Sequence, residues 1–302
     1  MSGELMAVGT AVMWGFAVTF FGMAGRRSDP AMVNILRLPL GLLILTGMWM
    51  AVSHTPWPTG VPARAHLWLG LSGTLGLTFG DTFLFHSVAS IGPRRATVVL
   101  AATPVFAAVS AWLMLGERLG PQALAGIGII VAGIVLATAT RDQGGGEFRD
   151  LPPAVLRRGL AGALVCAACS GVGNTFAKTG MTRAGADLDP LAATLVRMSW
   201  ATAAVVTLLW WNRRTLRNLA LVRSRRVVWP MAGGLVLGPS VGMVLGISAI
   251  KATDTGVASV LMNTVPLTVL LPAWIFFRDP PTRPAVIGIL MALGGASLLF
   301  LR

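Results

Sequence analysis

Two similar stretches, one in each half of the sequence, constrain the fold of this chain more than any other feature. The first, Ala101 to Leu136, is an apolar run with Pro104, a charged break at Glu117 and a second apolar run rich in glycine. Each run is long enough to cross a hydrocarbon core of about 30 Å as a helix, and the break suits a tight interfacial turn. The pattern returns near the end of the chain, so that Pro104 corresponds to Pro266, Glu117 to Asp279, Gly126 to Gly288 and Gly133 to Gly295. We therefore predict a transmembrane hairpin that occurs twice.

A second pair of matching segments extends the duplication to the rest of the chain. The string DPAMVNILR, from Asp29 to Arg37, aligns without a gap with DPLAATLVR, from Asp189 to Arg197. We therefore predict a first repeat at residues 1–140, a central linker at residues 141–157 and a second repeat at residues 158–302.

The composition indicates that both repeats lie in a membrane. Of the 302 residues, 55% are hydrophobic and only 12% are charged, whereas soluble domains carry roughly 25% charged residues. Ten apolar stretches are predicted as helices: Glu4–Ala24, Ala31–Val52, Leu67–Ile91, Ala96–Leu115, Pro121–Ala139, Gly159–Met181, Pro190–Trp211, Val227–Ile250, Thr255–Phe277 and Pro284–Leu301. Because five spans per repeat is an odd number, the second repeat must enter the membrane upside down, as in many secondary transporters. The predicted fold class is an all-α membrane protein with ten transmembrane helices as two inverted five-helix repeats.

The distribution of positive charge predicts how the chain is oriented. Sixteen of the 24 Lys and Arg residues fall in odd-numbered loops, and six fall in even-numbered loops or at the termini. Since positive charge marks cytoplasmic loops, this distribution places both termini outside the cytoplasm. It also accounts for the formal net charge of +13, which in a soluble protein would suggest a nucleic-acid partner.

A carboxylate near the middle of the third apolar stretch is the strongest candidate for a functional site. Thr74, Thr78, Asp81 and Phe85 recur at spacings of four, three and four residues, so an α-helix places them on one face. A carboxylate at membrane depth costs several kcal/mol unless it is hydrated, paired or protonated, which marks Asp81 as functional by default. The alternative is a carboxyl group held structurally by a neighbouring helix.

Further candidates come from polar residues and prolines at equivalent places in the two repeats. Trp14 and Asn174 correspond when the two Asp-Pro motifs are aligned, within surfaces that either pack closely or line a cavity. Pro104 and Pro266 fall inside equivalent helices, where we predict paired kinks at a central site or gate, or kinks that serve only packing. The predicted substrate-binding residues are Trp14, Thr78, Asp81, Phe85, Thr103, Asn174 and Asn263.

Inversion of the repeats also brings charges of opposite sign to the same face of the membrane. Arg37 and Asp279 are expected at one face, and Arg197 and Glu117 at the other. We predict that these two couples close the ends of the pathway alternately. The alternatives are acids that favour helix N-termini and arginines that extend to the interface.

Motifs typical of other protein classes are absent or misplaced. The string from Gly238 to Gly242 matches the G-x-S-x-G of hydrolases, but it lies in a predicted transmembrane segment rather than between a strand and a helix. Cys166 and Cys169 form a C-x-x-C inside an apolar stretch, where packing is the simplest interpretation. Because no zinc spacing, phosphate loop or dinucleotide fingerprint occurs, we expect no enzyme activity, cofactor or metal.

The stretch TPVFAAVSAWLMLGERLGPQALAGIGIIVAGIVL resembles the signature end of an EamA domain, and the predicted ten-helix layout is similar to the drug/metabolite transporter superfamily. The resemblance implies transport, often export, of amino acids and other small metabolites through a central cavity between the repeats. It also implies cytoplasmic termini, opposite to the charge count. The related small multidrug transporters use a membrane-embedded Glu for proton exchange. All three Glu here lie at helix ends or in a loop, which leaves Asp81 as the alternative proton site.

These observations predict a secondary active transporter, working as an exporter of amino acids or related metabolites by alternating access. The expected partners are a small-molecule substrate and the lipid bilayer of the cell membrane, without nucleic acid, in a monomer or homodimer. A proton-coupled exporter of drugs or cations, with protons as a further partner, is the alternative. A channel and a non-transporting membrane protein are further alternatives.

Overall fold

The computed structural model describes residues 3–116, 120–139, 148, 150–182, 188–211, 224–252, 261–262 and 264–300. These residues form an all-helical structure and include no strand. Each of the ten predicted apolar stretches is helical over most of its described part.

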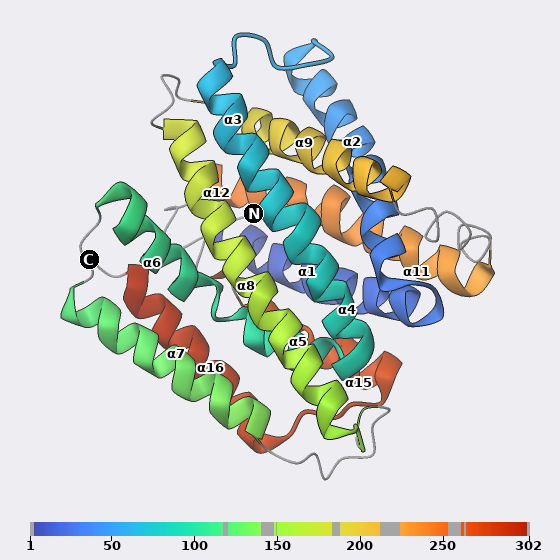
Figure 1. Cartoon of the computed structure of the whole chain (residues 1–302), viewed down its shortest axis with the longest axis vertical. Helices are drawn as coiled ribbons and strands as arrows, with labels where there is room; N and C mark the ends of the chain where they lie inside the picture. Colours follow the sequence, from blue (N-terminus) through green and yellow to red (C-terminus); the bar gives the residue numbers. More distant parts are fainter. Residues whose placement is uncertain are drawn as a thin grey trace.

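Figure 1 shows the helices of both halves in one molecule. The first half contains α1 (Gly3–Arg27), α2 (Pro30–Ser53), α3 (Ala63–Ser72), the π-helix η1 (Gly73–Gly80), α4 (Asp81–Ile91), α5 (Pro93–Leu100), α6 (Thr103–Leu115) and α7 (Pro121–Ala139). The second half contains α8 (Pro153–Thr182), α9 (Pro190–Trp211), α11 (Arg225–Leu235), the π-helix η3 (Val236–Gly242), α12 (Met243–Ala252), α14 (Val265–Thr268), α15 (Leu270–Phe277) and α16 (Arg283–Phe300).

Several of these helices are long and apolar enough to cross a membrane. By length and composition, the candidate spans among the described residues are Gly3–Arg27, Pro30–Ser53, Pro93–Met114, Pro153–Met181 and Pro190–Leu208. The apolar helices Leu124–Ala137, Val265–Phe277 and Arg283–Leu298 are shorter.

The duplicated Asp-Pro motif sets the starts of α2 and α9. Asp29 accepts a hydrogen bond from the amide of Ala31 at 3.0 Å, and Asp189 accepts one from the amide of Leu191 at 2.8 Å. A carboxylate at the N-cap satisfies an amide with no partner in the helix, and proline suits the first helical position because its fixed φ is already helical. This local geometry explains why the motif recurs at the start of both helices.

The two π-helices lie at equivalent places in the duplicated sequence. η1 ends at Gly80 and η3 ends at Gly242, and these glycines correspond in the alignment that matches Pro104 with Pro266. Each joins an α-helix on either side, so α3–η1–α4 and α11–η3–α12 run on without an intervening loop. A π-helix bonds i to i+5 and has more residues per turn than an α-helix. The single face predicted for Thr74, Thr78, Asp81 and Phe85 therefore does not persist through η1.

Pro104 and Pro266 each lie in the first turn of an α-helix rather than in the interior of one. α5 ends at Leu100, Ala101 and Ala102 form a turn, and Pro104 lies in the first turn of α6. Pro266 likewise lies in the first turn of the short helix α14. Since proline has no amide hydrogen and clashes with the preceding turn, it is better tolerated at a helix start than in the interior.

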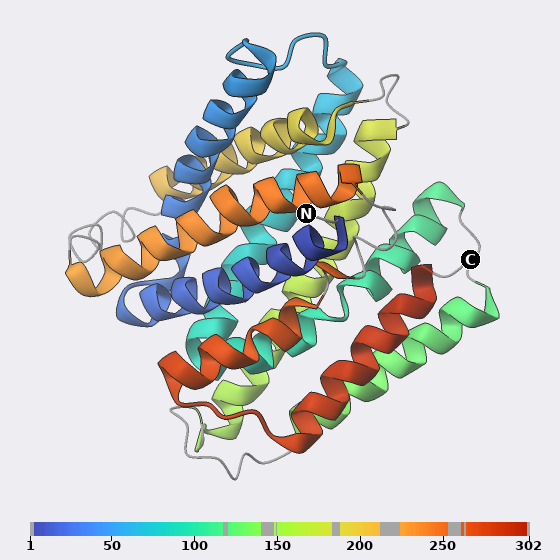
Figure 2. The ribbon, with the colours of Figure 1, turned by 180° about the vertical axis from the view of Figure 1, so that it is seen from behind.

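α1 is the helix around which much of the structure packs. It contacts α2, α4, α11, η3, α12 and α14, and Figure 2 shows it beside the long α11–η3–α12 helix. Gly15 permits a close approach of α14, because a β-carbon there would lie 2.7 Å from the hydroxyl oxygen of Thr268. That hydroxyl donates a hydrogen bond to the carbonyl of Ala11 at 2.7 Å.

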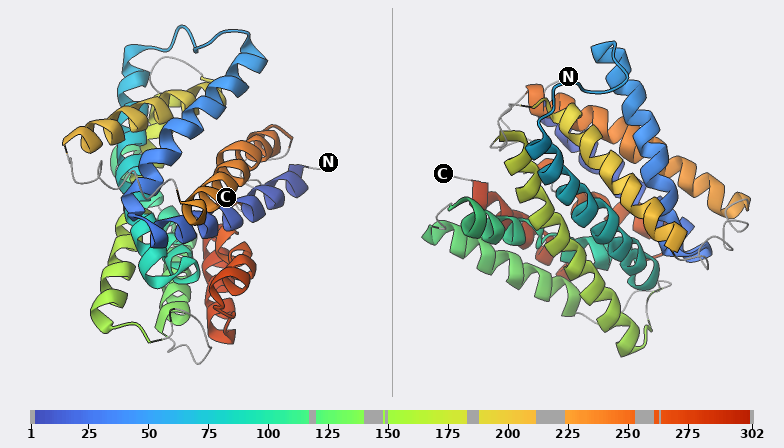
Figure 3. Two further views of the ribbon diagram at one scale, coloured as in Figure 1. Left: turned by 90° about the vertical axis from the view of Figure 1, so that its right-hand side faces the viewer. Right: turned by 45° about the horizontal axis from the view of Figure 1, so that its top comes forward.

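The last helices of the two repeats, α7 and α16, pack against each other along their length, as Figures 1 and 3 show. A β-carbon at Gly295 would lie 2.6 Å from the carbonyl oxygen of Gly126, and one at Gly133 would meet the backbone of Gly288. Small residues allow transmembrane helices to approach at backbone distance, where van der Waals contact stabilises the pair. The glycines of the duplicated hairpin therefore serve this helix contact.

Candidate functional site

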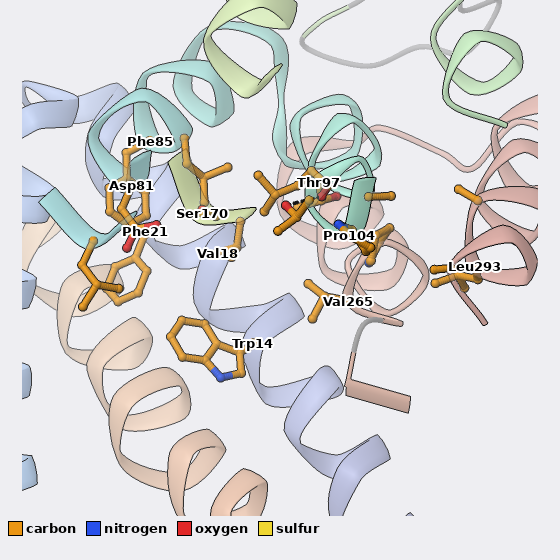
Figure 4. A pocket seen from close by; sticks show the side chains of 18 of the residues that line it. Trp14, Val18, Phe21, Asp81, Phe85, Thr97, Pro104, Ser170, Val265 and Leu293 are labelled. Atoms are coloured by element: carbon orange, nitrogen blue, oxygen red, sulfur yellow. Dashed lines mark hydrogen bonds between the residues drawn. The ribbon is translucent and has the colours of Figure 1, made fainter. Parts of the chain in front are cut away.

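A cavity of about 320 Å³ lies between helices from both halves of the chain. Its volume is near the lower end of the range for small-molecule sites, roughly 300–1,000 Å³. α1, α4, α5, α6, α14 and α16 supply most of the wall, and α2, η1 and α8 supply one residue each. Most of the lining side chains are apolar, among them Trp14, Phe21, Leu100, Val265 and Leu293. Figure 4 shows Asp81, Phe21 and Phe85 at one side of this space and Leu293 at the opposite side.

An ion pair between Arg37 and Asp81 forms the polar side of the cavity. Nη2 of Arg37 donates a hydrogen bond to Oδ2 of Asp81, and both residues line the space. The guanidinium carbon lies 5.4 Å from the centroid of the Phe85 ring, within range of a cation–π interaction. The side chains of Arg37 and Asp81 are only 4% and 17% exposed. Mutual pairing offsets part of the cost of burying both charges.

The hydroxyl groups in the lining are largely committed to their own helices. Thr97 donates to the carbonyl of Pro93 at 2.8 Å, and Thr103 donates to the carbonyl of Leu100 at 2.7 Å. The Thr103 bond supplies a partner at the break before α6. The Arg37–Asp81 pair is therefore the strongest polar feature that the described lining residues present to a ligand.

A second buried ion pair lies one helical turn from the cavity. Thr97 lines the cavity, and Arg94, one turn earlier in α5, binds both carboxylate oxygens of Asp279. The Nε–Oδ2 and Nη2–Oδ1 distances are 3.0 and 2.9 Å, and the two side chains are 3% and 7% exposed. Two parallel hydrogen bonds of this kind fix orientation as well as charge. This pair ties the start of α5 to the segment between α15 and α16.

Phe148, from the segment between the two repeats, packs against the start of α5 and the end of α15. Its side chain is 3% exposed, its carbonyl accepts a hydrogen bond from Arg95 at 2.9 Å, and its ring packs on Phe277. Gly92 makes room for that ring, because a β-carbon there would lie 2.8 Å from it. The guanidinium of Arg26 lies 4.8 Å from the ring centroid. The ends of α1, α4 and α15 are thus held together by one aromatic side chain.

The predicted couple of Arg37 with Asp279 is wrong for this structure. Arg37 pairs with Asp81, and Asp279 pairs with Arg94. Arg37 lies in the second turn of α2 and faces α4, whereas Arg94 begins α5 directly beside Asp279. The membrane face expected for an arginine does not identify which neighbouring helix it contacts. Glu117, the predicted partner of Arg197, lies outside the described residues, so that couple stays a prediction.

The structure brings together six of the other predicted residues and leaves two apart. Trp14, Asp81, Phe85, Thr103, Pro104 and Pro266 line the cavity. Thr78 instead donates a hydrogen bond to the carbonyl of Ala201 in α9, since η1 turns it away from Asp81. Asn174 is exposed on α8, and Ser170, one turn earlier, lines the cavity in its place. Asn263 lies outside the described residues.

Comparison with known sequences assigns the family. The profile of the EamA-like transporter family matches the chain twice, at residues 1–139 and 157–301. The chain belongs to the EamA-like transporter family. A curated member, the "Uncharacterized transporter YoaV" of Bacillus subtilis (strain 168), is 30% identical over 141 residues, which are 46% of this chain. The match spans 47% of that relative, about half its length.

A solved structure titled "Crystal structure of protein" has the same fold as this EamA-like protein. The two share a TM-score of 0.63 at 17% identity, over 98% of this chain and 94% of the other. Members of the EamA-like family are transporters rather than enzymes. Together with several helices apolar enough to cross a bilayer, the family places this chain among membrane transport proteins.

Proposed function

We propose that this EamA-like protein is a secondary active transporter that exports small amphipathic metabolites, with α-amino acids that carry an apolar side chain as the best candidates. The observation that carries the proposal is the Arg37–Asp81 pair at one side of an otherwise largely apolar cavity. An α-amino acid presents a carboxylate beside an ammonium group, which matches the guanidinium and the carboxylate of this pair. Its side chain would extend toward Pro104 and Leu293.

The proposed mechanism is alternating access between two inverted five-helix repeats, ten membrane spans in all. Two observations support this layout: the family profile matches twice, and the two π-helices end at corresponding glycines, Gly80 and Gly242. The cavity draws its wall from both repeats, as expected for a site at a repeat interface. The buried Arg94–Asp279 pair and Phe148 would form the closed end, and their separation would open it.

Exchange of protons for lipophilic cations, the alternative function, fits the cavity less well. Asp81 is the one carboxylate among the described lining residues, and Arg37 already neutralises it. A cation would have to displace the guanidinium before it could bind the carboxylate. An uncharged or zwitterionic ligand adds no net charge to the pair, so its binding avoids that electrostatic cost.

A thermal-shift panel on the purified protein in detergent tests the proposed substrate class. The panel contains L-phenylalanine, L-leucine, L-glutamate, a nucleoside and tetraphenylphosphonium. A ligand at one hundred times its Kd stabilises the folded state by about 2.7 kcal/mol. We expect shifts with the two apolar amino acids that are lost in Asp81→Asn and kept in His86→Asn, a control at an exposed residue of α4.

Transport itself is tested in proteoliposomes loaded with labelled L-phenylalanine. We expect saturable efflux that external unlabelled L-phenylalanine accelerates by exchange. Non-saturable flux would indicate a channel, and a shift with tetraphenylphosphonium alone would favour the cation exporter. The cell membrane is the proposed location, with the Arg26–Arg27 loop on the cytoplasmic side.

A further inference from the structure

Asn34 is a fully buried residue of α2 that does not line the cavity. It forms hydrogen bonds with Arg37 and with η1, the helical segment directly before Asp81. Its side-chain nitrogen lies 2.9 Å from the carbonyl oxygen of Leu77, 3.0 Å from that of Thr78 and 3.0 Å from the hydroxyl of Thr82. Its side-chain oxygen accepts from Nε and Nη2 of Arg37 at 3.4 and 3.1 Å. The amide therefore uses its donors and its acceptor together.

The surroundings of Asn34 define which way its amide points. A carboxamide nitrogen can only donate, and a guanidinium can only donate. Reversal of the amide would set an oxygen against two carbonyl oxygens and a nitrogen against the donors of Arg37. Only one orientation is compatible with all five contacts, with two N–H groups shared among three acceptors, so Asn34 is held at the junction of α2 with η1 and α4.

Asn34 thereby determines which part of the Arg37 guanidinium remains available. Nε and Nη2 donate to Asn34, and Nη2 also donates to Asp81. Nη1 makes no hydrogen bond to a residue that the structure describes, and it is not among the buried atoms that lack a partner. Arg37 lines the cavity, and Nη1 is the guanidinium nitrogen that neither Asn34 nor Asp81 occupies.

Asn34 also fixes the helix that carries the carboxylate. Leu77 and Thr78 belong to η1, and Asp81 begins α4 immediately after it. Hydrogen bonds to two η1 carbonyls tie that helix to α2. A single amide thus sets the positions of both Arg37 and Asp81.

In the second repeat, Arg197 corresponds to Arg37, but no residue that the structure describes there holds it as Asn34 holds Arg37. When the two Asp-Pro motifs are aligned, Thr194 stands in place of Asn34, and its hydroxyl bonds to the carbonyl of Pro190 in its own helix at 2.7 Å. When Pro104 is aligned with Pro266, Met243 stands in place of Asp81. Nε of Arg197 is buried and has no hydrogen-bond partner among the described residues. The order around Arg37 is therefore a property of the first repeat rather than of the arginine.

From these contacts we infer that Asn34 is a positioning residue for substrate recognition: it holds the Arg37 guanidinium so that Nη1 binds an acceptor oxygen of the ligand. The inference rests on the proposed function, in which the Arg37–Asp81 pair is the polar subsite. Hydrogen bonds to charged groups contribute enough that loss of the correct geometry weakens binding on the order of tenfold or more.

A double-mutant cycle measured by calorimetry tests this role, with L-phenylalanine as the probe and its Kd as the readout. We expect Asn34→Leu to raise Kd at least about tenfold and Arg37→Met to raise it by a similar or larger factor. Because Asn34 acts on the ligand chiefly through Arg37, adding Asn34→Leu to Arg37→Met should raise Kd by a clearly smaller factor than Asn34→Leu alone does, the remainder reflecting its hold on η1 and Asp81, whereas independent roles would multiply. Thr194→Ala is the matched control in the second repeat and should leave Kd unchanged.

Each other result identifies what has failed. If Asn34→Leu raises Kd equally with and without Arg37, Asn34 serves the fold and the positioning role is wrong. If Arg37→Met leaves Kd unchanged, the polar subsite of the proposed function is wrong, and the role of Asn34 with it. If no compound of the panel binds the unmodified protein, both fall together.

A second variant covers the case in which Asn34→Leu does not yield a folded protein. Asn34→Thr introduces threonine, the residue that the second repeat carries at the position equivalent to Asn34, which is Thr194. We expect Asn34→Thr to elute as the unmodified protein does in gel filtration and to raise Kd about as much as Asn34→Leu. A folded Asn34→Thr protein with unchanged Kd would contradict the inference.

Discussion

Removal of one partner from the Arg94–Asp279 pair should destabilise the protein strongly. Both side chains are nearly inaccessible and joined by two hydrogen bonds of 2.9 and 3.0 Å. Loss of one member of a buried pair leaves an uncompensated charge, which costs about 3–5 kcal/mol. At roughly 2–4 °C of melting temperature per kcal/mol, a figure for soluble proteins of about 150–250 residues, the expected decrease is on the order of 10 °C.

Four variants are measured by thermal unfolding in detergent. Together they distinguish the destabilisation caused by one unpaired buried charge from the net stability that the intact pair contributes. Asp279→Asn and Arg94→Met should each show the large decrease, followed through tryptophan fluorescence. The double variant Arg94→Met/Asp279→Leu should recover most of it, because apolar residues of similar volume replace buried ion pairs at little or no net cost. Arg64→Met, at an exposed position, is the control and should change little.

The same variants also test whether this end opens during transport. Loss of the pair should make the closed end easier to open, so a cysteine placed at Thr282, whose hydroxyl contacts Arg94, should react faster with a water-soluble maleimide. A melting temperature of Asp279→Asn that stays close to that of the unmodified protein would refute the reasoning. It would mean that water or another group already compensates the charge.

Three further predictions concern helix packing, the cavity and orientation. Gly295→Ala should destabilise the protein by about 1–3 kcal/mol through a clash with the backbone of α7, whereas Gly294→Ala, with nothing within 4 Å, should not, as thermal unfolding will show. Leu293→Trp should fill the apolar side of the cavity and abolish the thermal shift with L-phenylalanine, and an unchanged shift would place the ligand elsewhere. In cells, a cysteine at Ser28 should resist an impermeant maleimide and one at Gly60 should react; the reverse pattern would support cytoplasmic termini.

The duplication and most helices could be predicted from the sequence because they depend on local patterns. Apolar length, proline, glycine and the Asp-Pro motif act within a few residues of where they stand, so their positions carried over into the structure. Asp81 and Phe85 were also predicted as neighbours, since a four-residue spacing in α4 places both on one face.

The contacts of Thr78 and Arg37 could not be predicted in the same way. η1 changes the number of residues per turn, and an α-helical period therefore assigned Thr78 to the wrong face. The partner of Arg37 depends on which helices meet, and the membrane face expected for each charge pointed to Asp279 instead of Asp81. Asn34 carried no signal beyond being one polar residue in an apolar helix, although its position three residues before Arg37 shows in retrospect that both share a face.

The two π-helices show which part of the duplicated architecture is independent of the ion pair. In the first repeat Asn34 satisfies carbonyls of η1, and in the second the hydroxyl of Ser240 bonds to the carbonyl of Leu235, five residues earlier. The charge at Asp81 has no counterpart at Met243, yet the helix widens at the same place. Because the π-helix is present both before Asp81 and before the uncharged Met243, backbone geometry rather than ligand chemistry explains it. The wide turns provide the packing of η1 against α9 and of η3 against α1, and the first repeat adds the ion pair that a ligand would recognise.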